Sequence, residues 1–195
     1  MVRIFLSLVY FSARALISIR ISPNLATIIG GLIGGAAALL AISEQWLWAA
    51  AIAAFSSLLD GVDGAIAEIT NRKSKFGAVL DAVVDRFVEL SWFTALALVG
   101  ADLAAVVSLG LAILIMEYTR SKANSLGITG AGMITIAERP TRVIMFVMLC
   151  VGVFMIGTEN SALTIGSWTL TAVTLFATAQ LFSWFANQLR NNTSR

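Results

Sequence analysis

The chain has 195 residues, of which 58% are hydrophobic and 12% are charged, whereas soluble domains are about half apolar and about a quarter charged. The net charge of +2 is too small to indicate nucleic-acid binding, and we expect no nucleic-acid partner. The absence of histidine excludes histidine-based acid–base catalysis and His-rich zinc sites. Cys150 is the one cysteine, which excludes an intrachain disulfide. The composition therefore predicts a protein whose natural solvent is the lipid bilayer.

The N-terminal segment, residues 1–22, mixes Arg3, Arg14 and Arg20 with apolar and aromatic side chains. The arginines interrupt the apolar run and no small-residue cleavage site follows, so we do not expect a cleaved signal peptide. The pattern predicts an amphipathic juxtamembrane helix lying in the membrane interface, with a short tilted span as the alternative. Pro23 then breaks the chain and favours a helix that starts at its first turn.

Six further segments are apolar and about 20 residues long, the length at which a helix crosses a bilayer. Their ranges are 24–43, 45–69, 77–98, 101–123, 141–156 and 162–188. Basic residues lie in the connections on one side, while the opposite connections contain Glu44, Asp102 and Glu159 without Lys or Arg. This positive-inside distribution predicts a multi-pass protein of the plasma membrane with both termini in the cytoplasm. We therefore expect an all-α integral membrane fold, with residues 23–190 as one six-helix transmembrane domain and residues 191–195 as a cytoplasmic tail.

Glycines are concentrated in the first of these segments, at Gly30, Gly31, Gly34 and Gly35. Two overlapping pairs of small residues at this spacing let another helix approach closely. The favoured interpretation is packing within the chain, and the alternative is the seam of a homodimer. We also expect the chain to assemble as a homodimer.

Two pairs of aspartates flank a short basic connection, residues 71–75. Asp60 and Asp63 are three residues apart on one predicted helix, and Asp81 and Asp85 are four apart on the next, so each pair shares a helix face. With a rise of about 1.5 Å per residue, each pair lies within about 15 Å of the cytoplasmic end of its helix. Four carboxylates can therefore converge at shallow depth in the cytoplasmic leaflet.

Four converging carboxylates need compensation, because one buried aspartate already costs about 2.5–3.5 kcal/mol in a membrane helix. Divalent cations that prefer oxygen ligands, such as Mg²⁺, Mn²⁺ or Ca²⁺, would supply it. The alternative is that the aspartates form buried ion pairs with Arg72, Lys75 and Arg86. The two matched helical spacings favour the metal.

The segment 60–85 resembles the signature of the CDP-alcohol phosphatidyltransferase family, D-x-x-D-G-x-x-A-R-x8-G-x3-D-x3-D. Seven of its eight defined positions are present, namely Asp60, Asp63, Gly64, Ala67, Gly77, Asp81 and Asp85. Glu68 stands where the family has an arginine that helps to hold the donor's phosphates. Either Arg72 or Lys73 substitutes for that arginine, or the chain is an inactive relative.

The resemblance implies a membrane enzyme that moves a phosphatidyl-type or archaetidyl-type group from a CDP-linked lipid to an alcohol, with release of CMP. Asp60, Asp63 and Asp81 would be metal ligands for Mg²⁺ or Mn²⁺, with two ions expected. Asp85 would be the general base and a contact of the second ion. The site would lie on the cytoplasmic side. Residues matching positions near the CDP-lipid in the family are Asn24, Thr27, Gly64, Ala67, Glu68, Ser74 and Gly77.

A second basic group consists of Arg120, Lys122, Arg139 and Arg142. Its E-Y-x-R-x-K-A and E-R-x-x-R segments are similar to those of the branch of the family that uses inositol phosphate. They predict a pocket for the phosphate of a small acceptor such as inositol 1-phosphate, with glycerol 3-phosphate or another alcohol as the alternative. Ordinary positive-inside anchoring is the simpler explanation of the same residues.

Two other classes of membrane protein also use intramembrane carboxylates. A cation transporter would place them near the midplane on broken helices, whereas these lie near one face beside cationic connections. A membrane prenyltransferase would carry its two acidic motifs on well-separated helices. The four aspartates lie on one helical hairpin, which favours the transferase.

Overall fold

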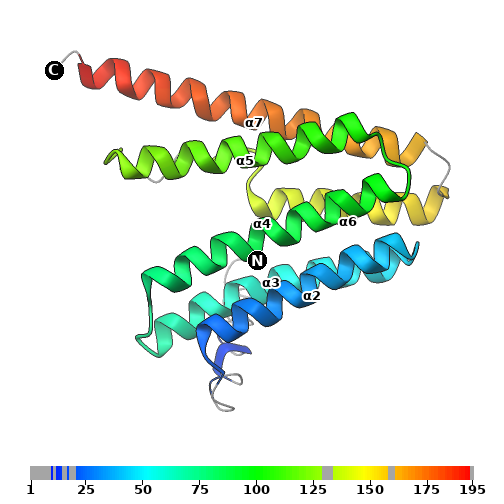
Figure 1. Cartoon of the computed structure of the whole chain (residues 1–195), viewed down its shortest axis with the longest axis horizontal. Helices are drawn as coiled ribbons and strands as arrows, with labels where there is room; N and C mark the ends of the chain where they lie inside the picture. The colour runs from blue at the N-terminus through cyan, green and yellow to red at the C-terminus, as the bar shows by residue number, and fades with distance from the viewer. Residues whose placement is uncertain are drawn as a thin grey trace. The chain divides into compact units, whose positions relative to one another are not determined.

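The computed structural model describes residues 10, 12–14, 17, 21–128, 134–157 and 161–193, and in these residues the regular structure is entirely helical. The chain divides into two compact units, Met1–Ala95 and Leu96–Arg195. The helices, labelled in Figure 1, are α2 (Pro23–Ile42), α3 (Trp46–Ile69), α4 (Lys75–Leu98), α5 (Leu103–Ser125), α6 (Arg139–Ile156) and α7 (Ser161–Thr193).

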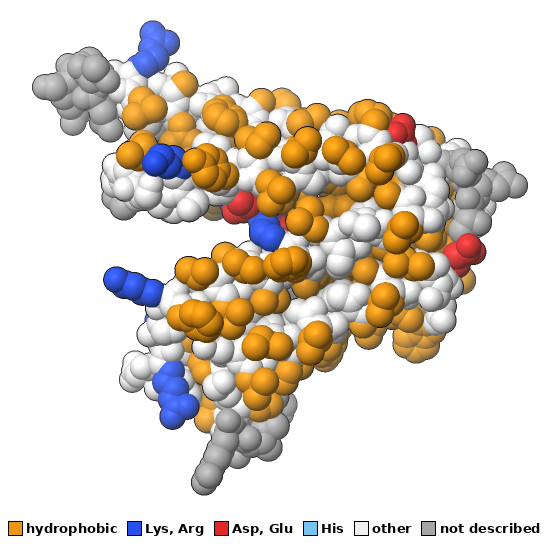
Figure 2. Space-filling view, viewed as in Figure 1, with side chains coloured by type: hydrophobic (Ala, Val, Ile, Leu, Met, Phe, Trp, Pro, Cys, Tyr) orange, Lys and Arg blue, Asp and Glu red, His pale blue; other side chains and the backbone are white. Residues whose placement is uncertain are grey.

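Five helices in the described part of the chain are long and apolar enough to cross a membrane: α2, α3, α5, α6 and most of α7. Figure 2 shows hydrophobic side chains spread along the helices of both units, with most of the Lys and Arg side chains on this face near helix ends. These features confirm the prediction of a multi-pass helical membrane protein. Helix α4 has the required length but carries four charged residues between Asp81 and Glu89, so the sixth span stays a prediction.

In the first unit, α2 packs along α3 and also contacts α4 at its glycines. A Cβ atom added to Gly31 would lie 2.3 Å from a methyl group of Val84, and one added to Gly34 would lie 2.7 Å from a methyl group of Val88. The Trp92 indole N–H also donates to the Gly34 carbonyl oxygen over 2.7 Å. These two glycines therefore serve packing within the chain, which is the interpretation that we favoured.

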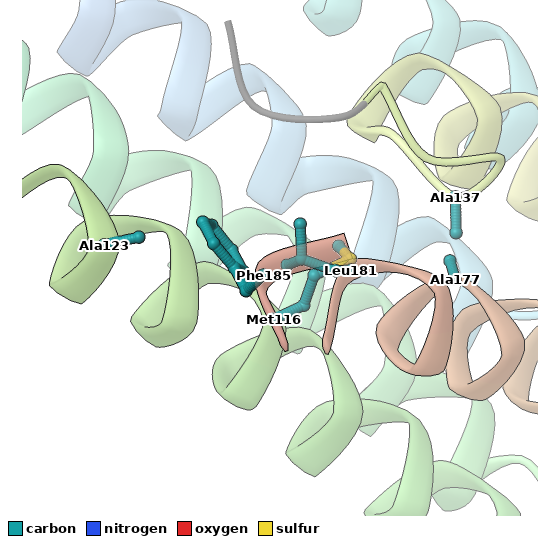
Figure 3. Close-up of a cluster of buried hydrophobic side chains, with 6 residues drawn as sticks. All are labelled: Met116, Ala123, Ala137, Ala177, Leu181 and Phe185. Carbon is teal, nitrogen blue, oxygen red and sulfur yellow. The ribbon is translucent and has the colours of Figure 1, made fainter. Parts of the chain in front are cut away.

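In the second unit, α7 packs against both α5 and α6. Figure 3 shows a buried cluster in this unit, made of Met116, Ala123, Ala137, Ala177, Leu181 and Phe185. Within the membrane-spanning region, the Thr171 hydroxyl donates to the Ala105 carbonyl oxygen of α5 over 2.9 Å. Small and threonine side chains thus let these helices pack closely and form interhelical hydrogen bonds, which stabilise helix association in a membrane, where the hydrophobic effect does not.

Most of the predicted amphipathic helix lies outside the described residues. Residues 12–14 are helical, and Ala13 is fully buried in a cluster with Ala26 of α2 and with Val62 and Ile66 of α3. At least this part of the segment therefore packs against α2 and α3 within the first unit. Whether the segment lies in the membrane interface stays a prediction.

The helix bounds differ from the predicted spans by a few residues, and capping explains the starts of α4 and α5. Helix α4 begins at Lys75 because the Ser74 hydroxyl accepts the Gly77 N–H over 2.9 Å. Helix α5 begins at Leu103 because the Asp102 carboxylate caps it. Helix α7 continues to Thr193, into the predicted tail, because no proline or glycine follows Gly166 to end it.

Candidate active site

The connection between α3 and α4 shapes the first part of the site. Asn71 ends α3 in the left-handed region, with φ of 53°, which asparagine tolerates better than most residues. The Arg72 N–H donates to the Ala67 carbonyl oxygen over 2.9 Å, which closes the turn. The Ser74 cap then starts α4. This short connection brings the carboxylates of α3 and α4 together in the half of the helical hairpin nearer the connection.

Three of the four predicted aspartates meet in that half of the hairpin. Asp60 on α3 and Asp81 and Asp85 on α4 each offer a carboxylate oxygen within 4.8 Å of the others. Oxygen ligands lie about 2.0–2.6 Å from Mg²⁺ or Ca²⁺, so two ligands of one ion are at most about 5 Å apart. The donor set and its spacing therefore fit a divalent cation. Arg86 lies 3.8 Å from Asp85, so one ion pair of the alternative interpretation is also present.

Asp63 is directed elsewhere. Its side chain is buried, and its Oδ2 accepts the Thr27 hydroxyl of α2 over 2.5 Å. Its Oδ1 accepts the N–H of Gly64 over 2.6 Å. Hydrogen bonds to a charged acceptor are stronger than those between neutral groups, so α2 holds this carboxylate in a defined position. Asp63 is not among the three aspartates whose oxygens meet.

A cavity of about 230 Å³ opens beside the carboxylates. Asp63 and Asp81 are in its wall, so the cavity adjoins the group of three aspartates through Asp81. Six of the seven residues predicted to lie near the CDP-lipid also line it: Asn24, Thr27, Gly64, Ala67, Ser74 and Gly77. They come from α2, α3 and the start of α4, which only the packing of the first unit brings together.

The seventh residue, Glu68, is not in the cavity wall. Its carboxylate pairs instead with Lys73 Nζ over 2.6 Å, and both side chains are more than half exposed. Lys73 lines the cavity together with Arg72. The acidic side chain at the position of the family's arginine is therefore matched by a cation from the adjoining connection.

In the second unit, the predicted acceptor residue Arg120 is held by Glu138. Both terminal nitrogens of Arg120 donate to the two oxygens of this carboxylate, one of them over 2.8 Å. The Thr135 N–H and hydroxyl donate to the same carboxylate over 2.7 and 2.9 Å. Desolvation raises the pKa of Glu138, but the hydrogen bonds from Arg120 and Thr135 outweigh it and lower the pKa to about 2.

The other predicted acceptor residues differ in exposure. Arg142 is 1% exposed, donates to the Ala137 carbonyl oxygen over 2.5 Å and lies 3.6 Å from the Glu117 carboxylate. Lys122 is exposed at the end of α5, and Arg139 is partly buried at the start of α6. Acidic partners thus hold Arg120 and Arg142, and whether the group binds a phosphate stays a prediction.

Comparison with known proteins connects this geometry to a family. Residues 20–179 match the family model of the CDP-alcohol phosphatidyltransferases. The chain belongs to this family. It is therefore a CDP-alcohol phosphatidyltransferase with several membrane-spanning helices.

Two relatives named for inositol-containing products cover most of the chain. The archaetidylinositol phosphate synthase of Pyrococcus horikoshii is 35% identical over 152 residues, which are 73% of this chain and 79% of the relative. The phosphatidylinositol phosphate synthase of Corynebacterium glutamicum is 29% identical over 181 residues, which are 86% of this chain and 79% of the relative.

Solved structures of the phosphatidylinositol phosphate synthase of Mycobacterium tuberculosis have a similar fold. Its crystal structure with CDP-DAG bound is 25% identical, has a TM-score of 0.78, and the match covers 90% of this chain and 92% of that chain. A second structure of the same enzyme, in complex with manganese and citrate, matches with the same TM-score and identity over 90% and 87% of the two chains. The fold of this family member thus agrees with that of a solved phosphatidylinositol phosphate synthase.

Sequence reasoning missed one contact within the predicted site and one buried residue beside it. It identified Thr27 and Asp63 separately, but their hydrogen bond joins residues 36 positions apart and has no local signal. It assigned no role to Glu89, although this residue continues the four-residue spacing of Asp81 and Asp85. That regular spacing on α4 was the signal that could have identified it.

Proposed function

We propose that the chain transfers a phosphatidyl-type or archaetidyl-type group from a CDP-linked lipid to inositol 1-phosphate, with release of CMP. The observation that carries the proposal is the cavity whose wall includes Asp81, a member of the group of three aspartates. A nucleotide diphosphate in this cavity would lie beside those carboxylates. The names of the relatives support inositol phosphate as the acceptor, because they share it while differing in the lipid.

Different residues of the cavity would bind different parts of the donor. Arg72 and Lys73 supply positive charge to the diphosphate, and the Ser74-capped start of α4 directs backbone N–H groups toward anions. Gly64 and Gly77 leave the helix surfaces bare, so that a nucleotide can approach the backbone. Mg²⁺ or Mn²⁺, with two ions expected, would neutralise the diphosphate and the leaving CMP when bound by the aspartates.

The chemical step requires a base beside the donor phosphate. Asp85 takes the proton from the acceptor hydroxyl while the oxygen of that hydroxyl attacks the phosphorus that carries the lipid. A bond forms between this oxygen and the phosphorus, and the bond from the same phosphorus to the CMP oxygen breaks. Its burial and its place within the group of three carboxylates support this role.

The acceptor phosphate would be bound by the basic group Arg120, Lys122, Arg139 and Arg142. The Arg120–Glu138 and Arg142–Glu117 pairs support this, because they order two of the guanidinium groups in advance. A guanidinium that is already ordered loses less side-chain entropy when it binds a phosphate.

The test is CMP release by purified protein supplied with CDP-lipid and a panel of acceptors. We expect inositol 1-phosphate to be used in preference to inositol, serine and glycerol 3-phosphate. Preference for glycerol 3-phosphate would show that the proposed acceptor is wrong and would leave the proposed transferase reaction standing. If none of the acceptors in the panel led to CMP release, the result would contradict the proposed function.

A variant tests the basic group directly. Arg139→Gln should raise the acceptor KM by about ten- to a hundredfold, because a hydrogen bond to a charged group contributes about 1.5–3 kcal/mol. The KM for CDP-lipid should stay nearly unchanged. Arg190→Gln is the matched control, because Arg190 is an exposed cation at the end of α7 that has no assigned role in the site. Equal behaviour of the two variants would indicate simple membrane anchoring.

We also propose that both termini and the active site face the cytoplasm of a plasma-membrane protein. The distribution of basic residues supports this orientation. The proposed assembly is a homodimer, for which Gly35 is a candidate contact because it has open space beside it on α2.

A further inference from the structure

Glu89 is a buried carboxylate on α4 to which the proposed reaction assigns no task. It follows Asp81 and Asp85 at the same four-residue spacing, so the three carboxylates share one face of the helix. Its side chain is 1% exposed. A buried carboxylate in a membrane helix is costly and normally faces a partner or a functional pathway. Its position therefore requires an explanation.

Arg86 lies between Glu89 and the group of three aspartates. Its Nε is 3.4 Å from Glu89 Oε2, and its Nη2 is 3.8 Å from Asp85 Oδ2. The side chain of Arg86 is 19% exposed, so these charges interact with little screening by water. One guanidinium is thus shared between a carboxylate that belongs to the site and one that does not.

The sharing has a consequence for cation binding. A guanidinium that closed fully on Asp85 would occupy the oxygens that Asp85 offers beside Asp60 and Asp81, and would repel a divalent cation there. Asp85, Arg86 and Glu89 together carry a formal charge of −1. Without Glu89 that charge would be zero, and Arg86 would have one acidic neighbour fewer to draw it away from Asp85.

We propose that Glu89 is a positioning residue: it holds Arg86 away from Asp85 and so keeps the Asp85 carboxylate available to a divalent cation. The inference rests on the proposed function, because that function requires the aspartates to bind a metal. It assigns to Glu89 an effect on metal affinity that acts through Arg86.

The experiment is a titration of purified, substrate-free protein with Mn²⁺, in which electron paramagnetic resonance measures the free ion. We expect Glu89→Gln to weaken Mn²⁺ binding by about tenfold or more, because Arg86 turns to Asp85. Glu89→Asp should retain most of the affinity, because the negative charge remains. The double variant Glu89→Gln with Arg86→Gln should recover affinity close to that of the wild type.

Three outcomes would overturn the inference. Glu89→Gln could bind Mn²⁺ as the wild type does, the double variant could stay as weak as Glu89→Gln, or the wild type could fail to bind Mn²⁺. Size-exclusion chromatography checks that each variant folds. If Glu89→Gln does not fold, Arg86→Gln alone decides, because it should bind Mn²⁺ at least as tightly as the wild type, and weaker binding would refute the proposal. The titration uses no lipid or acceptor, so failure of the proposed reaction would appear separately, in the CMP assay.

Discussion

Replacing Thr27 by valine should loosen Asp63 and weaken the site from the α2 side. The Thr27 side chain is buried, and its hydroxyl donates to the buried Asp63 carboxylate over 2.5 Å. Valine has nearly the same shape as threonine, so the substitution removes the hydrogen bond while leaving little empty volume. The variant therefore separates the effect of the hydrogen bond from the effect of packing.

The size of the effect follows from the charge and burial of the acceptor. Asp63 is 7% exposed, so water cannot readily replace the lost donor. A hydrogen bond to a charged group contributes about 1.5–3 kcal/mol to the free energy of unfolding. On the scale of domains of this size, that corresponds to a decrease in Tm of about 3–12 °C. The KM for CDP-lipid should rise as well, because Asp63 is part of the cavity wall.

The assay is thermal unfolding of detergent-purified protein, together with the KM for CDP-lipid. Thr27→Ser is the matched control, because serine keeps the hydroxyl and loses only a methyl group. It should stay close to the wild type in KM. An unchanged Tm and KM in Thr27→Val would refute the reasoning, and a serine variant as damaged as the valine variant would indicate that packing is responsible.

Four further predictions concern the metal, the aspartates, the family's arginine position and pH. Excess EDTA should abolish CMP release and lower the Tm, because the unneutralised carboxylates repel one another and the bound ion no longer stabilises the fold; full turnover in EDTA would exclude the metal. Asp85→Asn should nearly abolish turnover with CDP-lipid binding largely retained, whereas Asp63→Asn should weaken donor binding, and equal loss of binding in both variants would contradict these separate roles. Glu68→Arg should leave the donor KM nearly unchanged, because Lys73 already supplies a cation to the cavity. A large gain in activity would indicate instead that Lys73 does not replace the family's arginine. The pKa of Glu138 is lowered from 4.5 to about 2 in the folded protein, so the stabilisation by its carboxylate is complete above pH 4.5 and is lost as the pH falls toward 2. The difference in Tm between the wild type and Glu138→Gln should therefore shrink between pH 4.5 and pH 2. A constant difference in Tm would contradict this prediction.

The sequence alone was sufficient for the membrane class, the approximate helices and the faces of the aspartates. Long apolar segments require the bilayer whatever their neighbours are, because hydrophobic length is a local property. Asp81 and Asp85 share a face of α4 for the same kind of reason, since their spacing matches one turn of a helix. The match of the segment 60–85 to the family's signature depended on this local regularity, and the comparisons confirm the family.

The tertiary structure decided which of these residues meet. Local spacing placed Asp60 and Asp63 together, yet Asp60 meets Asp81 and Asp85, whereas Asp63 contacts Thr27, 36 residues away. These contacts depend on how α2, α3 and α4 pack and on the rotamer that each carboxylate adopts, and neither follows from the period of a helix. The partners of Arg120 and Arg142 were hidden for the same reason, because the carboxylates of Glu138 and Glu117 reach them only after α5 and α6 have packed within the second unit.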